Sequence, residues 1–415
     1  MRLLALFLAL LLAGCAGSAP AGDPSPAAPP PLLLISVDGF LPRYQDAVET
    51  PALDRIAAAG LRAEYLEPVF PTLTFPNHYS IVTGLHPARH GIVSNTMFDP
   101  QFAAEGAPAS FSLGNRAAVE DARWWGGEPI WVTAERQGLR AHTLFWPGSE
   151  AAIGGVRPTR WLPYDDNLPH DARVDSVLAW LDLPPARRPH FLTLYFSHVD
   201  TQGHRYGPDA PEVAEAVREV DRALGRLLDG LEARGLWGRI NVLVTSDHGM
   251  AELSPERVVI LDDHISLTDD VERVTWSSAV PGLWVRPGRE EAVLAALRGV
   301  PGLTAYRADE TPARWHFRGH RRIAPVVLVA DEGWTITSRE NAARQGERLG
   351  RGGAHGYDNA LPSMRAHLLA AGPAFRTGTT GPVRVVDLYE AMAAALGLTP
   401  APNDGDPARA RQLLR

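Results

Sequence analysis

Six carboxylate and imidazole side chains in this sequence stand where they could bind metal ions. They are Asp38, Asp200, His204, Asp247, His248 and His355. Each of the three aspartates follows an apolar stretch with strand character, and ligands of parallel sheets bind beyond the carboxyl ends of the strands. We therefore expect these side chains to converge at one edge of a sheet. Carboxylates and imidazoles without thiolates suit zinc with an open coordination position.

Each of these residues alone has an ordinary structural explanation. An aspartate after a strand is usually a turn residue or a helix cap, and a single histidine is more often packed or solvated than bound to metal. The chain has 14 histidines, and only three of them fall in this pattern. Because several independent strand ends carry ligand residue types, a shared metal site is favoured over separate structural roles.

A hydroxyl nucleophile is the second chemical feature, in the segment 71–80. Its sequence, PTLTFPNHYS, predicts a loop that enters a helix, with Pro76 in the first helical turn. Thr74 would stand at the helix N-terminus, where backbone N–H groups and the helix dipole favour phosphate and a developing alkoxide. The alternative is that Thr74 only caps the helix, because a threonine hydroxyl needs a base or a metal to become a nucleophile.

Continuous apolar runs predict the strands that must position these residues. The runs lie at 32–37, 191–196 and 240–245, and they are typical of strands buried on both faces of a sheet. No segment repeats with a period of about 20 to 50 residues, which excludes a solenoid or a propeller. Helical patterns separate the runs. This alternation predicts an α/β domain with a mostly parallel central sheet.

Three helices are predicted from apolar spacing and capping residues. At 213–231 apolar residues recur at intervals of three and four, and Gly235 fits the C-cap. A second helix begins at Pro51, with Thr50 as its N-cap. A third pattern covers 385–396 and closes the domain.

Five short motifs occur together in one order along the chain. They read Asp38-Gly39-Phe40, Thr74-Phe75-Pro76-Asn77-His78, Asp200-x-x-Gly203-His204, Asp247-His248-Gly249 and Gly353-Ala354-His355-Gly356. This series resembles the nucleotide pyrophosphatase/phosphodiesterase family of the alkaline phosphatase superfamily, from about residue 31 to 396. The resemblance implies an α/β sandwich of the alkaline phosphatase type. Such a fold has a mostly parallel central sheet, helices on both faces and a small inserted subdomain.

The pattern and the resemblance together predict the domain boundaries. The phosphodiesterase domain would span 31–400, and 401–415 would form a C-terminal tail. The inserted subdomain would cover about 255–320, a stretch that mixes short strand patterns with a helix-like segment at 290–297.

The resemblance also implies a site with two zinc ions. One zinc would be held by Asp200, His204 and His355. The other would be held by Asp38, Asp247, His248 and the hydroxyl of Thr74. Two Zn²⁺ bring four positive charges and the three carboxylates remove three. About one positive charge would remain to meet the single negative charge of a phosphodiester.

The resemblance assigns substrate-binding roles to three further positions. Asn95 would hydrogen-bond a non-bridging phosphate oxygen, and Phe75 and Tyr164 would stack on the two sides of the nucleotide base. Asn95 and the N–H of Phe75 would support the charge that develops when Thr74 attacks phosphorus. From the residues alone, Asn95 is also compatible with a loop turn, and Tyr164 with a half-buried structural tyrosine.

Composition excludes several other chemistries. The 415 residues include one cysteine and no lysine, so the 40 Lys+Arg residues are all arginine. Schiff-base, pyridoxal phosphate and Walker A chemistry are therefore excluded, as are internal disulfides and CxxC zinc sites. The net charge of −8 argues against a nucleic-acid polymer as partner. A basic stretch at 318–322 is expected to be a solvated turn, with phosphate contact as the alternative.

The N-terminus predicts export and a lipid anchor. Residues 1–14 combine a charged start with an apolar run too short to span a bilayer, and they precede Cys15 as in the bacterial lipobox. Lipidation of Cys15, followed by an Ala/Pro-rich tether over 15–30, would hold the protein at a bacterial membrane, facing the periplasm. The alternative is an ordinary signal peptide cleaved near Ala16 or Ala19.

These observations predict a zinc-dependent enzyme that hydrolyses phosphodiester or pyrophosphate bonds in small nucleotides. Thr74 would form a phosphothreonine intermediate, and nucleoside 5′-monophosphate would be released. Two alternatives stay open: a phosphodiesterase acting on choline-type or lipid head groups, and a non-catalytic metal-binding surface lipoprotein. The sequence also leaves the oligomeric state and the physiological nucleotide open.

Overall fold

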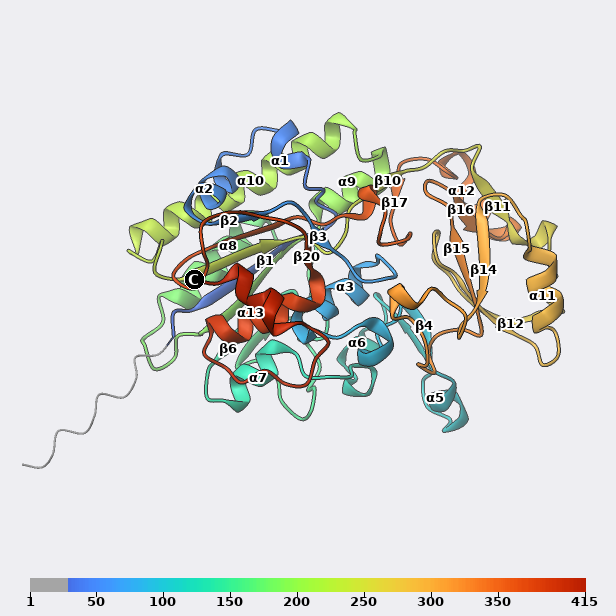
Figure 1. Cartoon of the computed structure of the whole chain (residues 1–415), viewed down its shortest axis with the longest axis horizontal. Coiled ribbons are helices and arrows are strands. Elements are labelled where there is room, and N and C mark those ends of the chain that lie inside the picture. The colour runs from blue at the N-terminus through green and yellow to red at the C-terminus, as the bar shows by residue number, and fades with distance from the viewer. Residues whose placement is uncertain (1–28) are drawn as a thin grey trace, which may run out of the picture.

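A mixed sheet of eight strands forms the centre of the molecule (Figure 1). The structure is a computed structural model, and it describes residues 29–415. From one edge to the other, the strands are β19 (Gly378–Thr380), β2 (Leu61–Ala63), β18 (Leu368–Ala371), β9 (Asn241–Thr245), β1 (Leu32–Val37), β8 (Phe191–Phe196), β6 (Ala141–Leu144) and β7 (Arg160–Leu162).

The register in the middle of this sheet decides where its strands end. β1 is parallel to both β8 and β9, and the pairs Val37↔Phe196 and Ser36↔Thr245 bring the three carboxyl ends to one level. All three strands are apolar runs that are buried throughout. β18 runs antiparallel to β9 and β2, so the sheet is mixed. The predicted α/β class with a mostly parallel sheet is confirmed.

Helices cover both faces of the sheet (Figure 1). Leu33 and Ile35 of β1 pack into one hydrophobic core, and Leu32 and Leu34 point the other way into a second core. The helices that contribute to the first core are α2 (Pro51–Ala59), α8 (His170–Leu181) and α10 (Pro211–Ala233), and those of the second core are α3 (Thr74–Thr83), α7 (Ile130–Arg136) and α13 (Leu388–Ala395). The two-residue period of a strand therefore builds a three-layer sandwich.

The start of α2 depends on a residue from a distant helix. Asp221 of α10 accepts hydrogen bonds from Ala52 N at 3.0 Å and from Leu53 N at 2.9 Å. Thr50 precedes the helix as predicted, but its side chain does not cap it, and its Oγ1 lies 3.4 Å from Gln45 O. The carboxylate of Asp221 satisfies the first helical N–H groups and is favoured by the helix dipole.

The other two predicted helices are present. The pattern at 213–231 corresponds to α10, and Gly235 just beyond it has a φ of +62°. Glycine is favoured there because the backbone is left-handed. The pattern at 385–396 corresponds to a 3₁₀ turn at Val385–Asp387 followed by α13.

A second sheet, with four antiparallel strands, stands beside the main one (right side of Figure 1). In spatial order its strands are β12 (Val271–Thr275), β13 (Gly282–Val285), β15 (Val326–Ala330) and β14 (Leu303–Arg307). The helix α11 (Glu290–Leu297) packs on β14. Because β15 pairs with both β13 and β14, this unit extends past residue 320, the limit predicted for the inserted subdomain.

Arg322 joins the segment before β15 to the main domain. The residue is 4% exposed, and its Nε donates to Asp99 Oδ2 at 2.7 Å. Its other nitrogens donate to the carbonyl oxygens of Gly91, Arg123 and Trp124. The prediction that 318–322 is a solvated turn is therefore wrong at Arg322, because the charge of Arg322 is buried in an ion pair with Asp99.

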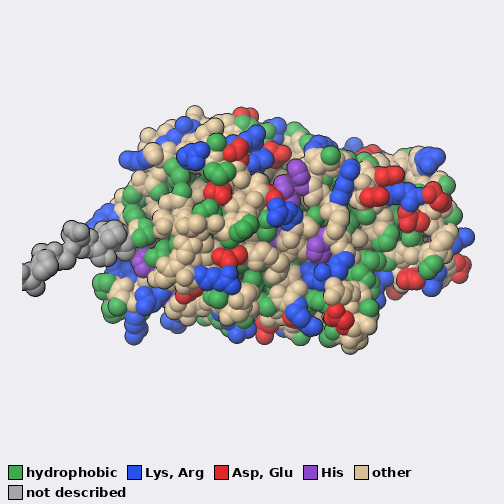
Figure 2. Space-filling view, turned by 60° about the horizontal axis from the view of Figure 1, so that its bottom comes forward, with side chains coloured by type: hydrophobic (Ala, Val, Ile, Leu, Met, Phe, Trp, Pro, Cys, Tyr) green, Lys and Arg blue, Asp and Glu red, His purple; other side chains and the backbone are tan. Residues whose placement is uncertain are grey.

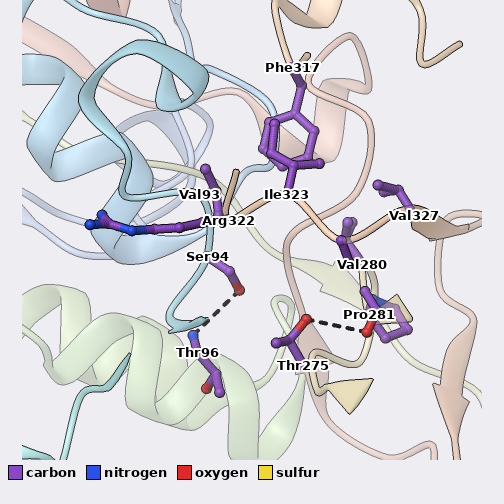
Figure 3. Close-up of a pocket in the computed structure, with 12 residues that line it drawn as sticks. Val93, Ser94, Thr96, Thr275, Val280, Pro281, Phe317, Arg322, Ile323 and Val327 are labelled. Carbon is purple, nitrogen blue, oxygen red and sulfur yellow. Dashed lines mark hydrogen bonds between the residues drawn. The ribbon is translucent and has the colours of Figure 1, made fainter. Parts of the chain in front are cut away.

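The contact between the two units is tightly packed around Arg322. Figure 3 shows Val93 and Ser94 of the main domain on one side and Thr275 and Val280 of the second unit on the other. The cavity that they line measures about 20 Å³. That volume has room for about one water molecule.

Shorter elements complete the fold. They are α1 (Tyr44–Ala47), α4 (Pro87–His90), α5 (Pro100–Ala104), α6 (Arg116–Glu120), α9 (His198–Tyr206), α12 (Arg339–Gln345), α14 (Pro407–Ala410), β3 (Leu66–Glu67), β4 (Thr96–Phe98), β5 (Ser110–Ser112), β10 (Ala251–Glu252), β11 (Val258–Ile260), β16 (Thr335–Thr337), β17 (Gly353–Ala354) and β20 (Val383–Arg384). In the segment 401–415, Leu413 is buried and its carbonyl accepts from Arg376 N at 3.1 Å. This segment therefore packs on the main domain.

Charges of both signs are interspersed on the surface. On the face in Figure 2, arginine and acidic side chains are both scattered over the surface, and histidine side chains are visible near the middle. Many of these charges form exposed pairs, such as Arg226 with Asp175 at 2.7 Å, and such pairs contribute little to stability. Across residues 29–415, no helix is both long enough and apolar enough to cross a membrane.

Candidate active site

Two neighbouring strand ends place three of the predicted ligands together. Asp38 directly follows β1, and Asp247 and His248 follow β9. One ligand atom from each lies within 4.8 Å of the others. His248 Nε2 is 3.4 Å from Asp38 Oδ1 and 2.9 Å from Asp247 Oδ2. Thr74 joins this group, since its Oγ1 lies 3.3 Å from His248 Nε2.

The remaining three predicted ligands lie beside the first group. Asp200 and His204 stand one turn apart on α9, and His355 directly follows β17. His204 Nε2 is 3.1 Å from His355 Nε2 and 3.5 Å from Asp200 Oδ2. Asp200 and His355 also form a compact group with His248. His248 thus lies between the two groups, and all the predicted ligand residues belong to one cluster.

Backbone carbonyl groups hold the three histidines in one orientation. Each Nδ1 lies at hydrogen-bond distance from a carbonyl oxygen: His204 from Gly353 (2.9 Å), His248 from Gly249 (2.9 Å) and His355 from Thr72 (2.8 Å). A carbonyl oxygen only accepts, so each Nδ1 must donate. In the neutral ring Nε2 then turns an unshared electron pair toward the cluster, which is the arrangement of a metal-ligating histidine.

Facing acceptor atoms make this cluster suitable for cations. When both rings donate through Nδ1, His204 Nε2 and His355 Nε2 have no proton to share across their 3.1 Å separation. Asp38 Oδ1, Asp200 Oδ1 and Asp247 Oδ2 are buried atoms with no hydrogen-bond donor among the described residues. Buried acceptors without donors are rare and destabilising. Cations between these atoms would relieve both conflicts, and this set of ligand types fits zinc.

Burial and crowding shift the titration of the cluster. Burial raises the pKa of Asp38 well above its usual value, and the neighbouring carboxylates add to this effect. Burial lowers the pKa of His355 well below its usual value, and positive charge on the neighbouring imidazoles adds to it. A bound cation favours ionised carboxylates and neutral imidazoles at the same time. Despite burial, the neighbouring imidazoles hold the pKa of Asp247 well below its usual value, and the charge of Asp247 raises the pKa of His248. A bound cation would therefore take the place of a proton on His248.

Thr74 is the first residue of α3, and among the described residues its Oγ1 makes its hydrogen-bond contact with His248 Nε2. Leu73 occupies the N-cap position, so the alternative that Thr74 only caps the helix is wrong. The preceding loop is held by the buried Asn77, whose Oδ1 accepts from Val69 N at 2.8 Å and whose Nδ2 donates to Leu73 O at 3.0 Å. The Thr74 hydroxyl is therefore left to face His248.

His78 connects α3 to the cluster, although sequence reasoning gave it no role. Its Nδ1 lies 2.9 Å from Thr74 O and 3.2 Å from Asp247 Oδ2, and its Nε2 lies 2.8 Å from Ser36 Oγ. The only signal for His78 in the sequence is its place in the motif that begins with Thr74. These contacts fix the position of the Thr74 backbone relative to Asp247.

Asn95 stands next to the start of α3. Its Oδ1 accepts a hydrogen bond from Phe75 N at 2.9 Å. The sequence predicted that Asn95 and the N–H of Phe75 both meet phosphate. In the structure the N–H of Phe75 instead orients the Asn95 amide, which leaves Nδ2 as the donor that can face a phosphate oxygen.

A groove of about 510 Å³ opens beside Thr74 and Asp38. Phe75 and Tyr164 both line it, so the structure brings the two predicted stacking residues to one groove. Tyr164 is 45% exposed, and its hydroxyl donates to Asp166 Oδ1 at 2.7 Å. An apolar groove that ends at a polar cluster suits a ligand with a planar ring and an anionic group.

Tyr195 is a site residue that the sequence did not reveal. It lies in β8, is buried, and donates from its hydroxyl to Asp38 Oδ2 at 2.5 Å. Burial and the charge of Asp38 raise the pKa of Tyr195 well above its usual value, so the hydroxyl remains a donor. An apolar strand run gives no sign that one of its members holds a carboxylate on the neighbouring strand.

Comparisons with known proteins agree with this geometry. A family model described as type I phosphodiesterase/nucleotide pyrophosphatase matches residues 32–358. The chain is 37% identical to a venom phosphodiesterase of Crotalus durissus collilineatus over 414 residues, which cover 97% of this chain and 48% of the relative. It is 38% identical to bis(5′-adenosyl)-triphosphatase ENPP4 of Bos taurus, covering 97% of this chain and 85% of that protein.

A solved structure is similar over nearly the whole chain. It is murine ectonucleotide pyrophosphatase/phosphodiesterase 5, as an inactive threonine-to-alanine variant in complex with AMP. The TM-score is 0.86 at 35% identity, and the match covers 93% of this chain and 100% of the murine one. By contrast, the chain spans about half the length of the venom phosphodiesterases that it matches.

The hydrogen bond from Tyr195 to Asp38 leads to a prediction about metal affinity. Replacing Tyr195 by phenylalanine leaves Asp38 without its donor and free to rotate, and loss of such a supporting bond lowers metal affinity by about 10–100-fold. We expect this loss for Tyr195→Phe, measured by competition for Zn²⁺ with a chromophoric chelator. Tyr389→Phe is the matched control, because Tyr389 is buried and bonds Thr133 instead. Equal affinities in the two variants would contradict the prediction.

Proposed function

The chain belongs to the type I phosphodiesterase/nucleotide pyrophosphatase family, and we propose that it hydrolyses phosphodiester or pyrophosphate bonds in small nucleotides, with release of nucleoside 5′-monophosphate. One observation carries this proposal: the Thr74 hydroxyl lies 3.3 Å from a ligand atom of the cluster, at the end of a groove with aromatic walls. A nucleophile, a cation site and a surface for a base therefore adjoin one another.

We propose that the cluster holds two zinc ions. Asp200, His204 and His355 would bind one of them. The other would be bound by Asp38, Thr74, Asp247 and His248. Bound there, zinc would supply Lewis acidity to the phosphoryl group and lower the pKa of a hydroxyl or a water molecule. Support comes from the buried oxygens without donors and from the inward-facing Nε2 atoms.

In the proposed reaction Thr74 is the nucleophile. Its Oγ attacks phosphorus in line, the bond from Oγ to phosphorus forms, and the bond from phosphorus to the leaving oxygen breaks. The threonine proton passes to solvent, and the leaving oxygen takes up a proton from water where it needs one. Water then attacks the phosphothreonine, the bond from phosphorus to Oγ breaks and Oγ takes up a proton, which restores Thr74 and releases the nucleotide. The position of Thr74 in the first turn of α3 supports this role, because helix N-termini favour phosphate.

Asn95 would stabilise the charge that develops on the equatorial phosphate oxygens. Its amide is already oriented by the N–H of Phe75, so no reorganisation of Asn95 is needed during the reaction. Phe75 and Tyr164 would hold the base between them. The AMP bound to the similar murine structure supports a nucleotide as the substrate class.

Thr74→Ala tests the nucleophile. We expect kcat to fall by at least about 10³-fold, because loss of a covalent nucleophile removes the whole two-step route. Zinc content, measured by plasma mass spectrometry, and the midpoint of thermal unfolding should change little. Thr379→Ala, at an exposed position on β19, is the matched control. Substantial activity in zinc-replete Thr74→Ala would show that another group attacks phosphorus.

A pair of chromogenic esters tests the substrate class. We expect the enzyme to prefer the p-nitrophenyl ester of thymidine 5′-monophosphate over p-nitrophenylphosphocholine, and Phe75→Ala to reduce that preference about tenfold, since stacking on a base contributes about 1–3 kcal/mol. A preference for the choline ester would support the head-group alternative. No hydrolysis of either ester by zinc-loaded protein would support the non-catalytic alternative.

We further propose that residues 1–14 are an export signal, that 15–30 form a tether, and that the domain of 31–400 is held through a lipid on Cys15 at a bacterial membrane, facing the periplasm. Cys15 and this leader lie outside the described residues. The proposal rests on the lipobox-like sequence before Cys15. The words "venom" and "ecto" in the names of relatives agree with a location outside the cytoplasm.

Cys15→Ser tests the anchor. Without the thiol no lipid can be attached, so we expect the full-length variant to move from the detergent phase to the aqueous phase in Triton X-114 partition of expressing cells. The wild-type protein provides the comparison, and activity per molecule should be equal. Retention of Cys15→Ser in the detergent phase would mean that something other than this cysteine holds the protein at the membrane.

A further inference from the structure

A buried arginine lies behind the wall of the groove with little compensation by negative charge. Arg173, on α8, is 1% exposed. Its ion-pair partner among the described residues is Asp166, whose Oδ1 lies 3.9 Å from Nη2. Burial lowers the pKa of Arg173 from its ordinary value. A buried guanidinium is destabilising unless its N–H groups are satisfied, so its contacts indicate what it is for.

The guanidinium satisfies its N–H groups with carbonyl oxygens around the groove. Nε donates to Leu168 O at 2.8 Å, Nη1 to Tyr195 O at 2.9 Å and Nη2 to Asp166 O at 3.1 Å. Its Cζ also lies 5.2 Å from the centre of the Phe145 ring, within the range of a cation–π contact. One side chain thus bridges a loop, strand β8 and the residue after β6.

The groups that Arg173 bridges belong to one aromatic wall. Phe145, Tyr164 and Tyr195 all line the groove beside Thr74. The ring of Tyr164 stands edge-to-face with Phe145 at 5.3 Å and with Tyr195 at 6.1 Å. Tyr164 is tied to the same loop, because its hydroxyl donates to the carboxylate of Asp166. Arg173 therefore contacts the ring of Phe145, the backbone of Tyr195 and the loop that carries Tyr164.

Phe145 needs this support more than its neighbours do. It is buried and has a φ of +61°, in the left-handed region that bulky residues rarely adopt. Such a conformation persists only when the surroundings hold it, and it is common at ligand sites. The cation–π contact with Arg173, which does not itself line the groove, is an attraction that helps to hold the ring in place.

We propose that Arg173 is a positioning residue that holds the aromatic wall opposite Phe75 and thereby sets the affinity for the nucleoside part of the substrate. This inference rests on the proposed function of the groove. Arg173 stands behind the wall and is separated from the metal cluster by Tyr195, which contacts both. Its loss should therefore weaken nucleoside binding and leave the attack on phosphorus largely intact.

Two phosphodiesters with the same leaving group separate these effects. The p-nitrophenyl ester of thymidine 5′-monophosphate has a nucleoside, and methyl p-nitrophenyl phosphate has none. For Arg173→Met, with zinc supplied, we expect KM for the thymidine ester to rise about tenfold, as loss of hydrogen bonds from a charged donor implies. We expect kcat for that ester, and kcat/KM for the methyl ester, to stay within about twofold of the wild type.

Arg226→Met is the matched control. Arg226 lies on α10 and pairs with Asp175 on the exposed side of α8, the helix that carries Arg173. The control variant should leave the kinetics of both esters unchanged. Arg173→Lys is the second test variant, since lysine keeps a charge but cannot direct a planar fork to three carbonyl oxygens. The same selective rise in KM is expected for it. Dissociation constants for AMP, measured by calorimetry in the Thr74→Ala background, should rise in parallel.

Three outcomes would overturn the proposal. Equal losses on both esters would mean a general structural role, no change on either ester would mean no role, and failure of both Arg173 variants to fold would make Arg173 a core residue only. Failure of the proposed function would be distinct from these, because the wild-type enzyme itself would not hydrolyse the thymidine ester.

Discussion

The structure depends on one electrostatic conflict, the crowding of acceptor atoms where β1, β8 and β9 end. Carboxylate oxygens without donors face imidazole nitrogens whose protons are turned away toward carbonyl groups. Protonation relieves this conflict only in part: Asp247 raises the pKa of His248, whereas burial and the neighbouring imidazoles lower the pKa of His355 well below its usual value. The cations that would resolve it would also activate a neighbouring hydroxyl. The feature that strains the folded chain is therefore the one that fits it for phosphoryl transfer.

A rigid frame is needed to hold such a conflict in place. The parallel register of β1 with β8 and β9 keeps three carboxyl ends level, and both faces of these strands are buried in hydrophobic cores. Supporting hydrogen bonds then orient individual ligands, as Tyr195 does for Asp38 and His78 does for the backbone of Thr74. The sheet fixes where the ligand residues lie, and these hydrogen bonds fix how the side chain of Asp38 and the backbone of Thr74 are oriented. Neither alone would direct the Thr74 hydroxyl toward His248.

What could be predicted from the sequence depended on the distance between the residues involved. The strands at 32–37 and 191–196 were predictable because their signal is a local apolar run. The cap on α2 was not, because Asp221 is 169 residues from Ala52. Likewise 157 residues separate Tyr195 from Asp38, and 223 separate Arg322 from Asp99. Strand patterns mark Tyr195 as buried, and nothing in them identifies the carboxylate it will hold.

Chemistry and recognition are supported by different kinds of structure in this fold. The ligand cluster is held mainly by strand ends and backbone carbonyl groups, with Tyr195 and His78 as supporting side chains. The wall of the groove is held by side chains, with Arg173 bridging Phe145, Tyr195 and the loop of Tyr164. Tyr195 contacts both parts, since its carbonyl oxygen accepts from Arg173 and its hydroxyl donates to Asp38. Substitutions in the loop of Tyr164 can therefore alter which ring fits the groove, while the cluster retains the geometry that phosphoryl transfer requires.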